Sequence, residues 1–252
     1  MKQICHVSWL GLVPYEDAWH LQNHLAGEIA EGKRPPILLL LEHPHTYTFG
    51  RRGQAGNLLW DEAELERRGV TVHWVDRGGD VTYHGPGQLV GYPLLPLAPG
   101  GIKTTPSNGS QRMPQADFVG YLRKLEQVLI SALDKFGITG EQIPGLTGVW
   151  VAEPTASSAA KRSTDPFQNR AKIAAIGVKV DVKGISLHGF ALNVNPNMTY
   201  WDGIVGCGLE GYQETSLAEL LNPPPAMAQV RDAVVSAFND RFGYIMEWRD
   251  TV

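Results

Sequence analysis

Apolar residues recur along the chain with two periods, one typical of helices and one typical of strands. Between Tyr15 and Glu31 they fall at helical spacing, and a second clean apolar face runs from Phe118 to Phe136. Prolines 223–225 open a third helical segment that extends to Phe242. Shorter helices are predicted over 61–68, closed by Gly69, and over 215–221, with Thr215 as the N-cap.

Strand-length apolar runs separate these helices. The pattern predicts strands in segments 36–42, 71–76, 88–95 and 148–153, and a buried strand around Cys5. Pro93 indicates a strand end or an edge strand in 88–95. The two β-rich halves of 173–196 flank Lys183-Gly184 and predict a hairpin. Strands come in clusters with helices between and after them, which predicts an α/β (α+β) chain with a mixed sheet and helices packed on it.

Two segments interrupt this pattern. Residues 98–115 are rich in Gly, Pro, Ser and Thr, and residues 154–171 are of low complexity. Such compositions favour flexible insertions. The N-terminal stretch lacks the apolar length of a secretory signal, and no apolar run approaches the roughly 20 residues needed to span a bilayer. We therefore expect a cytoplasmic protein.

Charge narrows the possible partners. The formal net charge of −4 over 252 residues argues against a broad nucleic-acid-binding face. Lys33-Arg34 and Arg51-Arg52 are local basic pairs that could face an acidic protein, although solvated surface charge is an equally simple interpretation.

The densest cluster of polar and glycine residues runs from Arg77 to Pro93. Glycines there allow tight turns and a close approach of the backbone to a ligand, while Tyr83 and His84 add hydrogen-bonding and titratable rings. The plain alternative is a pair of glycine-rich turns between strands. A dinucleotide-binding motif is disfavoured, since the glycine spacing differs and no helix follows.

Two cysteines differ in their surroundings. Cys5 lies in an apolar run and is predicted to be a core residue, whereas Cys207 lies between Gly206 and Gly208. Flanking glycines expose the sulfur and leave backbone N–H groups that could meet an oxyanion. A free cysteine in a tight turn is the alternative. Lys172, at the start of a strand, is by itself typical of a solvated charge.

Metal and hydrolase chemistry have weaker support. His43, His45 and His84 could together build a zinc site, yet no HExxH or paired-cysteine pattern accompanies them. No GxSxG elbow supports a serine hydrolase. We expect neither a metal nor a cofactor.

Several motifs together resemble those of the lipoyl(octanoyl) transferases of lipoate biosynthesis. They are EHPHTYTFGRR, RGGDVTYHGPGQLVGYPL, KIAAIGVKV, LHGFALNVNP, and GCG followed by TSL. The match covers nearly the whole chain outside the two insertions. It implies one catalytic domain over residues 1–252 with the biotin/lipoate protein ligase-like fold, in which a mixed sheet is flanked by helices and accompanied by a smaller second sheet.

The resemblance also implies site residues and partners. The acyl-bearing cysteine corresponds to Cys207 and the catalytic lysine to Lys172, which would favour the thiolate. Octanoyl-acyl carrier protein would be the donor, and lipoyl domains of 2-oxoacid dehydrogenase complexes and the glycine cleavage H protein the acceptors, with no nucleic acid or membrane involved. The implied substrate-binding residues are Arg77, Gly78, Gly79, Asp80, Val81, Thr82, Tyr83, His84, Ala175, Ile176, Gly177, Gly189, Phe190 and Ala191.

Within this scheme, Tyr83 and His84 are expected to position the acyl carbonyl, and the apolar slot to be lined by parts of 89–95, 173–177 and 189–192. Two alternatives remain open. An ATP-dependent lipoate or biotin ligase of the same fold would need no nucleophilic cysteine. A non-catalytic module would bind acyl carrier protein or a lipoyl domain without needing Cys207.

Overall fold

The computed structural model describes residues 3–97, 117–153, 169–206 and 212–252. The predicted insertion at 98–115 lies outside the described residues, as do Cys207 and residues 154–168 of the second predicted insertion. That second prediction extended too far, because Arg170 and Ala171 already belong to a strand. They pair with Ala152 and Val151 of the preceding strand, which brings them into the main sheet.

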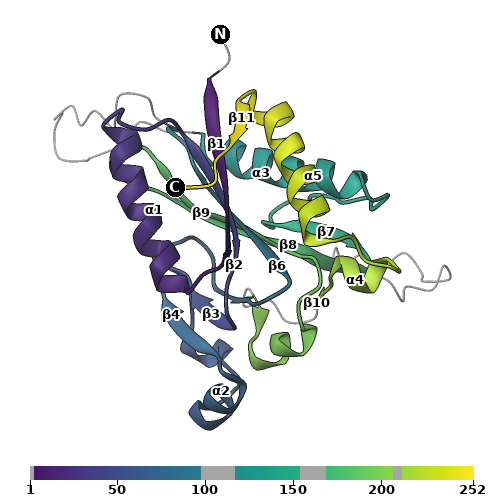
Figure 1. Ribbon diagram of the computed structural model, residues 1–252. Helices are drawn as coiled ribbons and strands as arrows, with labels where there is room; N and C mark the ends of the chain where they lie inside the picture. Colours follow the sequence, from purple (N-terminus) through teal and green to yellow (C-terminus); the bar gives the residue numbers. More distant parts are fainter. Residues whose placement is uncertain (1–2, 98–116, 154–168, 207–211) are drawn as a thin grey trace.

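A mixed eight-stranded sheet forms the centre of the molecule (Figure 1). Its strands follow the order β10-β8-β9-β6-β2-β1-β11, and β7 pairs with β8 off this path. The bounds are β1 Ile4–Leu12, β2 Ile37–Glu42, β6 Gln88–Leu94, β7 Val149–Ala152, β8 Arg170–Val180, β9 Ser186–Asn193, β10 Gln213–Glu214 and β11 Ile245–Trp248. The predicted mixed sheet and the 173–196 hairpin are confirmed.

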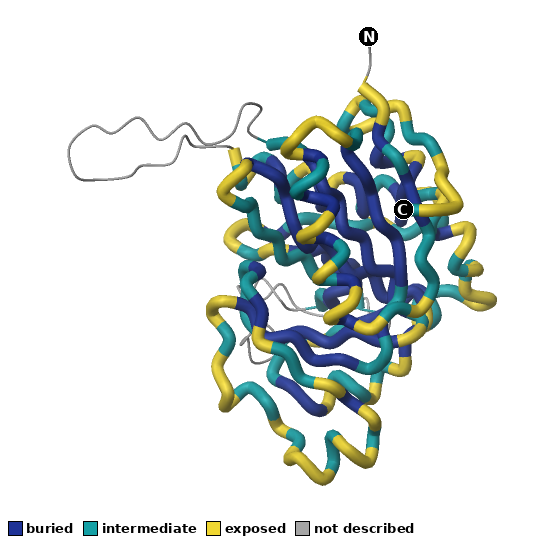
Figure 2. The backbone as a smooth tube through the Cα atoms, turned by 60° about the vertical axis from the view of Figure 1, so that its left-hand side comes forward, coloured by how far each residue is buried: buried dark blue, intermediate teal, exposed yellow. Residues whose placement is uncertain are grey.

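Helices cover both faces of this sheet, so its strands are apolar on both sides. In β2, Leu38 and Leu40 belong to the core beneath α3 (Phe118–Asp134) and α5 (Met227–Phe242). The alternate residues Ile37, Leu39 and Leu41 belong to the core beneath α1 (Tyr15–Ala30). Alternation along a strand sends successive side chains to opposite faces, which explains why this segment reads as an unbroken apolar run. Figure 2 shows the buried strands between these helical layers.

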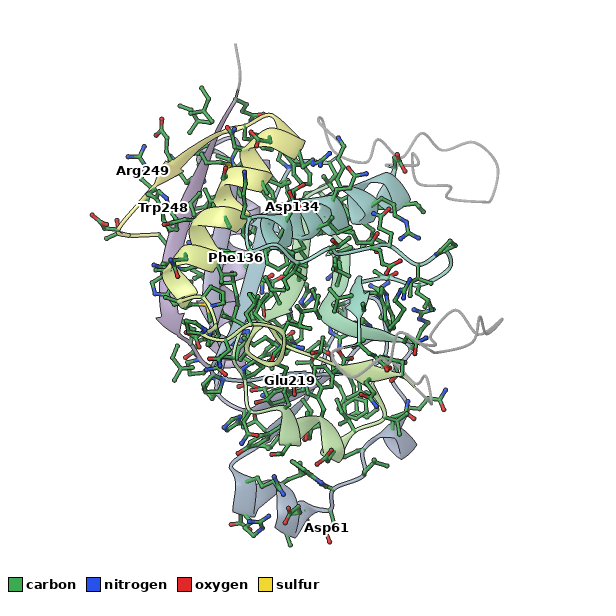
Figure 3. All side chains as sticks on the ribbon, turned by 90° about the vertical axis from the view of Figure 1, so that its right-hand side faces the viewer. Asp61, Asp134, Phe136, Glu219, Trp248 and Arg249 are labelled. Carbon is green, nitrogen blue, oxygen red and sulfur yellow. The ribbon has the colours of Figure 1, made fainter. Side chains whose placement is uncertain are left out.

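A smaller sheet of three strands lies beside one end of the main sheet (Figure 1). Its order is β4-β3-β5, with β3 at Thr46–Phe49, β4 at Thr71–Trp74 and β5 at Val81–His84. Helix α2 (Glu62–Arg68) precedes β4; Asp61 caps its N-terminus and Gly69, with φ 65°, ends it, as predicted. Figure 3 shows Asp61 at the opposite end of the molecule from Trp248 of β11 and the following Arg249.

Two local predictions need correction. Pro93 does mark a strand end, but β6 is not an edge strand, since it pairs with β2 on one side and β9 on the other. Helix α4 (Leu217–Leu220) is capped by Ser216 rather than Thr215; the Ser216 side chain accepts a hydrogen bond from the Glu219 N–H. Thr215 instead donates its hydroxyl to the Glu219 carboxylate.

The third helical segment begins after its prolines, since Ala226 is the N-cap of α5. Two short 3₁₀ helices, Ala55–Asn57 and Met198–Gly203, complete the regular structure of the described residues. None of the helices in the described ranges combines the length and the apolar character that crossing a bilayer requires.

Candidate active site

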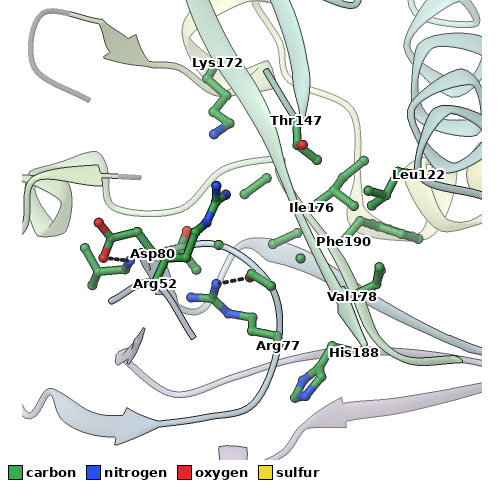
Figure 4. Close-up of a pocket in the computed structure, with 18 of the residues that line it drawn as sticks. Arg52, Arg77, Asp80, Leu122, Thr147, Lys172, Ile176, Val178, His188 and Phe190 are labelled. Atoms are coloured by element: carbon green, nitrogen blue, oxygen red, sulfur yellow. Dashed lines mark hydrogen bonds between the residues drawn. The ribbon is translucent and has the colours of Figure 1, made fainter. Parts of the chain in front are cut away.

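A cavity of about 560 Å³ opens between strand β5 of the small sheet, with the turn before it, and strands β8 and β9 of the main sheet (Figure 4). Lys172 and all of the predicted substrate-binding residues except Tyr83 line it. The topology explains this convergence. In the β8–β9 hairpin, Ala175 is the register partner of Ala191 and Gly177 that of Gly189. The Gly78 N–H donates to the Val178 carbonyl at 3.0 Å, which joins the glycine-rich turn to β8.

Arg77 is a buried cation on one wall of the cavity, with only 7% of its surface exposed. Its Nη2 donates to the Thr48 hydroxyl at 2.9 Å and also to the Thr48 carbonyl, while Nη1 donates to the Gly78 carbonyl at 2.9 Å. A guanidinium provides several donors in a rigid plane. Arg77 therefore fixes the turn that carries Gly78 and Gly79 against strand β3.

Asp76, which precedes Arg77 in the chain, joins two side chains of the opposite hairpin. Its carboxylate bonds His188 Nε2 at 2.9 Å and forms an ion pair with Lys179. These partners, with the His188 hydrogen bond the largest influence, hold the pKa of the Asp76 carboxyl well below its usual range. His188 has a φ of 58°, a left-handed conformation that is costly outside glycine, and its backbone N–H donates to Gln22 Oε1 at 2.7 Å. The Gln22 and Asp76 bonds hold His188 at the cavity wall.

Three buried histidines at the Arg77 end of the cavity are kept neutral. Burial lowers the pKa of His43 to about 4, and lowers the pKa values of His84 and His188 as well. His43 Nδ1 lies 2.7 Å from the Val13 carbonyl, so it carries the proton, and Nε2 accepts from the Tyr92 hydroxyl at 2.7 Å. The hydrogen bonds of His43 therefore suit an uncharged ring.

His84 lines the cavity, but its neighbour Tyr83 does not. In β5 successive side chains point to opposite faces. Tyr83 consequently lies in the core of the small sheet, where its hydroxyl pairs with His45 Nδ1 at 2.9 Å. The expected contact of Tyr83 with the acyl carbonyl has no support from this position. Because side chains alternate between the two faces of a strand, the sequence could already have predicted that Tyr83 and His84 point to opposite sides.

Lys172 lies at the other end of the cavity and is only 2% exposed. The solvated charge considered for this residue is therefore wrong. Its Nζ lies 5.4 Å from the centre of the Trp150 ring and 5.5 Å from that of Tyr212. Both aromatic faces attract an ammonium. Glu214 of β10 is its register partner across the parallel pair.

Tyr212 also contacts the residue that precedes Cys207 in the chain. Its hydroxyl donates to the Gly206 carbonyl at 2.8 Å. One side chain thus touches Gly206 through its hydroxyl and lies beside the Lys172 ammonium with its ring.

Cys5, by contrast, is completely buried, and burial raises the pKa of its thiol to about 12, which agrees with the predicted core role.

Leu122, Ile176, Val178 and Phe190 gather along one side of the cavity and give it an apolar surface (Figure 4). Of the slot segments expected from the sequence, Tyr92, residues 175–177 and residues 189–191 line the cavity. Leu122 comes from α3 and Thr147 from the loop before β7, and neither was expected. Only the three-dimensional packing of α3 on the sheet brings them here.

The two basic pairs differ in their surroundings. Lys33 forms an ion pair with Glu31 at 2.7 Å, and Arg34 forms one with Glu28 at 2.8 Å, so both are neutralised locally. Arg51 and Arg52 are both exposed, and Arg52 lines the cavity. Figure 4 shows the Arg52 side chain extending toward the part of the cavity that holds Lys172.

The three histidines considered for zinc are engaged elsewhere. Both ring nitrogens of His43 have hydrogen-bond partners, and His45 stacks on Tyr200 with ring centres 3.8 Å apart. Among the residues that the structure describes, no group of three His, Cys, Asp or Glu side chains is arranged to hold a metal ion.

Comparison with known proteins agrees with the resemblance seen in the motifs. Residues 14–239 match the family model of the lipoyl protein ligase A/B catalytic domain. A protein of Rubrobacter xylanophilus named octanoyltransferase is 42% identical over 92% of this chain and 91% of its own length. One of Chloroflexus aurantiacus with the same name is 40% identical over 94% of this chain and 93% of its own.

Solved structures show the same fold at much lower identity. A bi-partite lipoate protein ligase of Thermoplasma acidophilum superposes with a TM-score of 0.64 at 15% identity, covering 98% of this chain and 86% of that one. P. falciparum LipL1 in complex with lipoate gives 0.64 at 14% identity, covering 99% and 66%. The fold expected from the motifs is confirmed. Since the family model spans most of its length and these relatives align with it almost end to end, the chain belongs to the lipoyl protein ligase A/B catalytic domain family.

Proposed function

We propose that this protein is an octanoyltransferase that moves an octanoyl group from octanoyl-acyl carrier protein to the acceptor lysine of lipoyl domains. The acceptors would be lipoyl domains of 2-oxoacid dehydrogenase complexes and the glycine cleavage H protein. Two relatives that align over more than 90% of this chain carry the name octanoyltransferase. The observation that carries the proposal is a buried lysine at the end of a partly apolar cavity, with Gly206, the residue before Cys207, bonded to the same tyrosine that flanks the lysine.

In the first step the Cys207 thiolate attacks the thioester carbonyl carbon of the donor. A carbon–sulfur bond to Cys207 forms, and the bond to the donor sulfur breaks. The Lys172 ammonium first favours the thiolate and then gives its proton to the departing donor sulfur. The products are an octanoyl thioester on Cys207, a free carrier thiol and a neutral Lys172.

In the second step the acceptor lysine attacks the same carbonyl carbon as a neutral amine. The amide bond forms, the carbon–sulfur bond to Cys207 breaks, and the proton lost by the amine passes to the neutral Lys172. The enzyme returns to its starting state with a thiolate and an ammonium. Since a thioester is exchanged for an amide, this step is downhill and needs no ATP.

The cavity suits such a substrate in two ways. Its apolar side, formed by Ile176, Phe190 and their neighbours, can bury hydrocarbon, and each buried methylene contributes about 0.8 kcal/mol. The exposed Arg52 at the cavity, with the exposed Arg51 next to it in the chain, offers positive charge to the phosphate and acidic surface of a carrier protein.

Intact mass spectrometry tests the proposal. Incubation with octanoyl-acyl carrier protein is expected to add one octanoyl group, which hydroxylamine removes, and Cys207→Ala is expected to remain unmodified. Addition of a lipoyl domain should then discharge the adduct onto its lysine. An adduct that persists in Cys207→Ala would reject the proposed nucleophile.

The same assay separates the two alternatives. Transfer that requires ATP and free octanoate would indicate a ligase, because a ligase activates the acid as an adenylate. Tight binding of carrier protein without turnover in either half-reaction would indicate a non-catalytic module.

A further inference from the structure

Glu126 of helix α3 is a fully buried carboxylate outside the cavity. Its Oε1 accepts a hydrogen bond from the Gly148 N–H at 3.0 Å, and its Oε2 accepts one from Arg123 Nη1 at 2.7 Å. The same Nη1 donates to the Leu146 carbonyl at 3.3 Å. One turn of α3 therefore holds the segment 146–148 at two backbone points.

This segment is the wall against which Lys172 lies. Gly148 has a φ of 125°, and a Cβ built there would come within 2.7 Å of Lys172 Cε and 2.6 Å of the Ala174 carbonyl oxygen. Leu146 and Thr147 line the cavity beside it. The backbone at Gly148 is thus in van der Waals contact with the lysine side chain on one side and hydrogen-bonded to Glu126 on the other.

Stability alone is a poor reason for this arrangement. Burying an ion pair often gains no more than an apolar pair of the same volume, because both charges lose their hydration. An apolar residue at 126 would also leave the buried Gly148 N–H without the acceptor that Glu126 provides. What the carboxylate provides is two acceptors at defined points.

We propose that Glu126, together with Arg123, is a positioning residue for Lys172: it fixes segment 146–148 and thereby keeps the Lys172 ammonium in the place from which it favours the Cys207 thiolate. This inference rests on the proposed function, because it assigns Glu126 a role through the lysine of that mechanism. Glu126 itself does not line the cavity.

The direction in which the pKa of the Cys207 thiol changes separates a positioning role from a simple electrostatic effect. Glu126→Gln removes a negative charge, and charge removal by itself would favour a nearby thiolate and lower the thiol pKa. Loosening Lys172 has the opposite effect and raises it. The other charged groups of this region include Arg123 on α3, Glu214 on β10 and Arg52 at the cavity, and none of them changes in this variant.

The experiment measures the rate at which iodoacetamide alkylates Cys207 as a function of pH. Cys5 is buried, and its contribution is subtracted with Cys207→Ala. Lys172→Ala is expected to raise the midpoint of this pH profile by about one pH unit or more, and Glu126→Gln by about half a unit. Arg123→Lys, which keeps the charge and loses the planar fork, should raise it by less than Glu126→Gln. Val234→Ala, a core change on α5, controls for lost stability and should leave the midpoint in place.

A double variant tests whether Glu126 acts through Lys172. In the Lys172→Ala background, Glu126→Gln is expected to shift the midpoint no further, since coupled residues are non-additive. Hydrogen exchange at Gly148 should accelerate in Glu126→Gln and stay slow in Val234→Ala. A midpoint that is unchanged or lowered in Glu126→Gln, with Lys172→Ala raised as expected, would overturn the positioning role and leave the proposed function standing. An unchanged midpoint in Lys172→Ala would instead reject the Cys207–Lys172 pair and the positioning role with it.

Discussion

The two ends of the cavity each carry a buried cation, and they hold it in different ways. Arg77 is fixed by hydrogen bonds to the Thr48 hydroxyl and carbonyl and to the Gly78 carbonyl. Lys172 lies against the rings of Trp150 and Tyr212, with the Gly148 backbone beside its stem. Directional bonds thus orient the Arg77 guanidinium, and two aromatic faces lie beside the Lys172 ammonium and attract its charge.

The side-chain chemistry matches this difference. A guanidinium remains protonated at any pH the protein meets, while a buried ammonium can lose its proton. We therefore assign the Arg77 end to holding structure and substrate in place, and the Lys172 end to moving protons. Exchanging the two cations, or changing the residues that contact them, tests this assignment.

Lys172→Arg is expected to have the largest effect. The arginine keeps the positive charge that favours the Cys207 thiolate, but it cannot take a proton from the acceptor amine. Transfer to a lipoyl domain should fall by about 10²- to 10⁴-fold, the usual worth of general acid–base catalysis. Acyl-enzyme should accumulate, because the second step suffers more than the first.

Rapid quenching followed by intact mass measurement checks this prediction. Lys172→Ala is the control, since it removes the charge as well and should slow the first step too. Nearly unchanged rates of both steps in Lys172→Arg would show that the lysine serves only through its charge.

Gly148→Ala comes next and disturbs the wall beside Lys172. Its φ of 125° is unfavourable for any side chain, and the new Cβ would stand 2.7 Å from Lys172 Cε. We expect the rate of Cys207 acylation to fall by roughly 10- to 100-fold, since small displacements at a reacting group cost about this much. Stopped-flow measurement of carrier thiol release reports the rate.

Gly145→Ala supplies the matched control. Gly145 also has a positive φ, 83°, but a Cβ there would meet no atom within 4 Å. Gly145→Ala introduces the backbone strain without the steric clash. The temperature of thermal unfolding should therefore shift, while the rate of Cys207 acylation stays within a few-fold of that of the parent protein. Similar kinetic losses in both variants would mean that loop strain, not contact with Lys172, is responsible.

The same loop illustrates what the sequence can and cannot predict. Apolar periodicity located α1 and α3 because each buries one regular face, and the unbroken apolar run located β2 because both of its faces are buried. The motifs led to Lys172 and to the cavity-lining segments of β5, β8 and β9. Glu126 was missed because it lies in a helix whose apolar pattern conceals one buried carboxylate. Its partner Gly148 is 22 positions away, and only packing brings the two together.

Other misses have equally local causes. Strand β6 lies centrally although it contains Pro93, since the proline stands one residue from the strand end and costs the ladder little. Tyr83 was grouped with His84 because the two are adjacent, and adjacency in a strand means opposite faces. A pattern of residue types does not reveal which face is the cavity.

A loss of folding stability at acid pH is expected to come from the Arg77 end of the cavity, and this effect is smaller than the two losses of activity above. The folded pKa of His43 is lowered to about 4 from 6.5, so between these values the unfolded chain binds more protons than the folded one. The free energy of unfolding therefore rises with pH in this window, and the contribution is lost as pH falls through it. Between pH 7 and pH 5 we expect a loss of roughly 2 kcal/mol from His43.

Urea unfolding at several pH values measures this loss, with His43→Gln as the control. The glutamine variant should be less stable at pH 7 but should show a shallower dependence on pH. An equal slope in both proteins would place the acid sensitivity in other groups.

Arg77→Lys is the reciprocal exchange and should have the smallest effect. A lysine retains the charge at this end but offers one donor group where the guanidinium reaches both Thr48 and the Gly78 carbonyl. The turn carrying Gly78 and Gly79 would be held less firmly, while the proton transfers at Lys172 would be untouched. The KM for octanoyl-acyl carrier protein should rise by about 10-fold, equivalent to roughly 1.4 kcal/mol, with kcat nearly unchanged. Thr48→Val removes one of the same acceptors from the opposite side and should raise KM by less. If Arg77→Lys instead lowered kcat as much as Lys172→Arg does, the two ends would share the chemistry, and the division between a holding cation and a proton-transferring cation would fail.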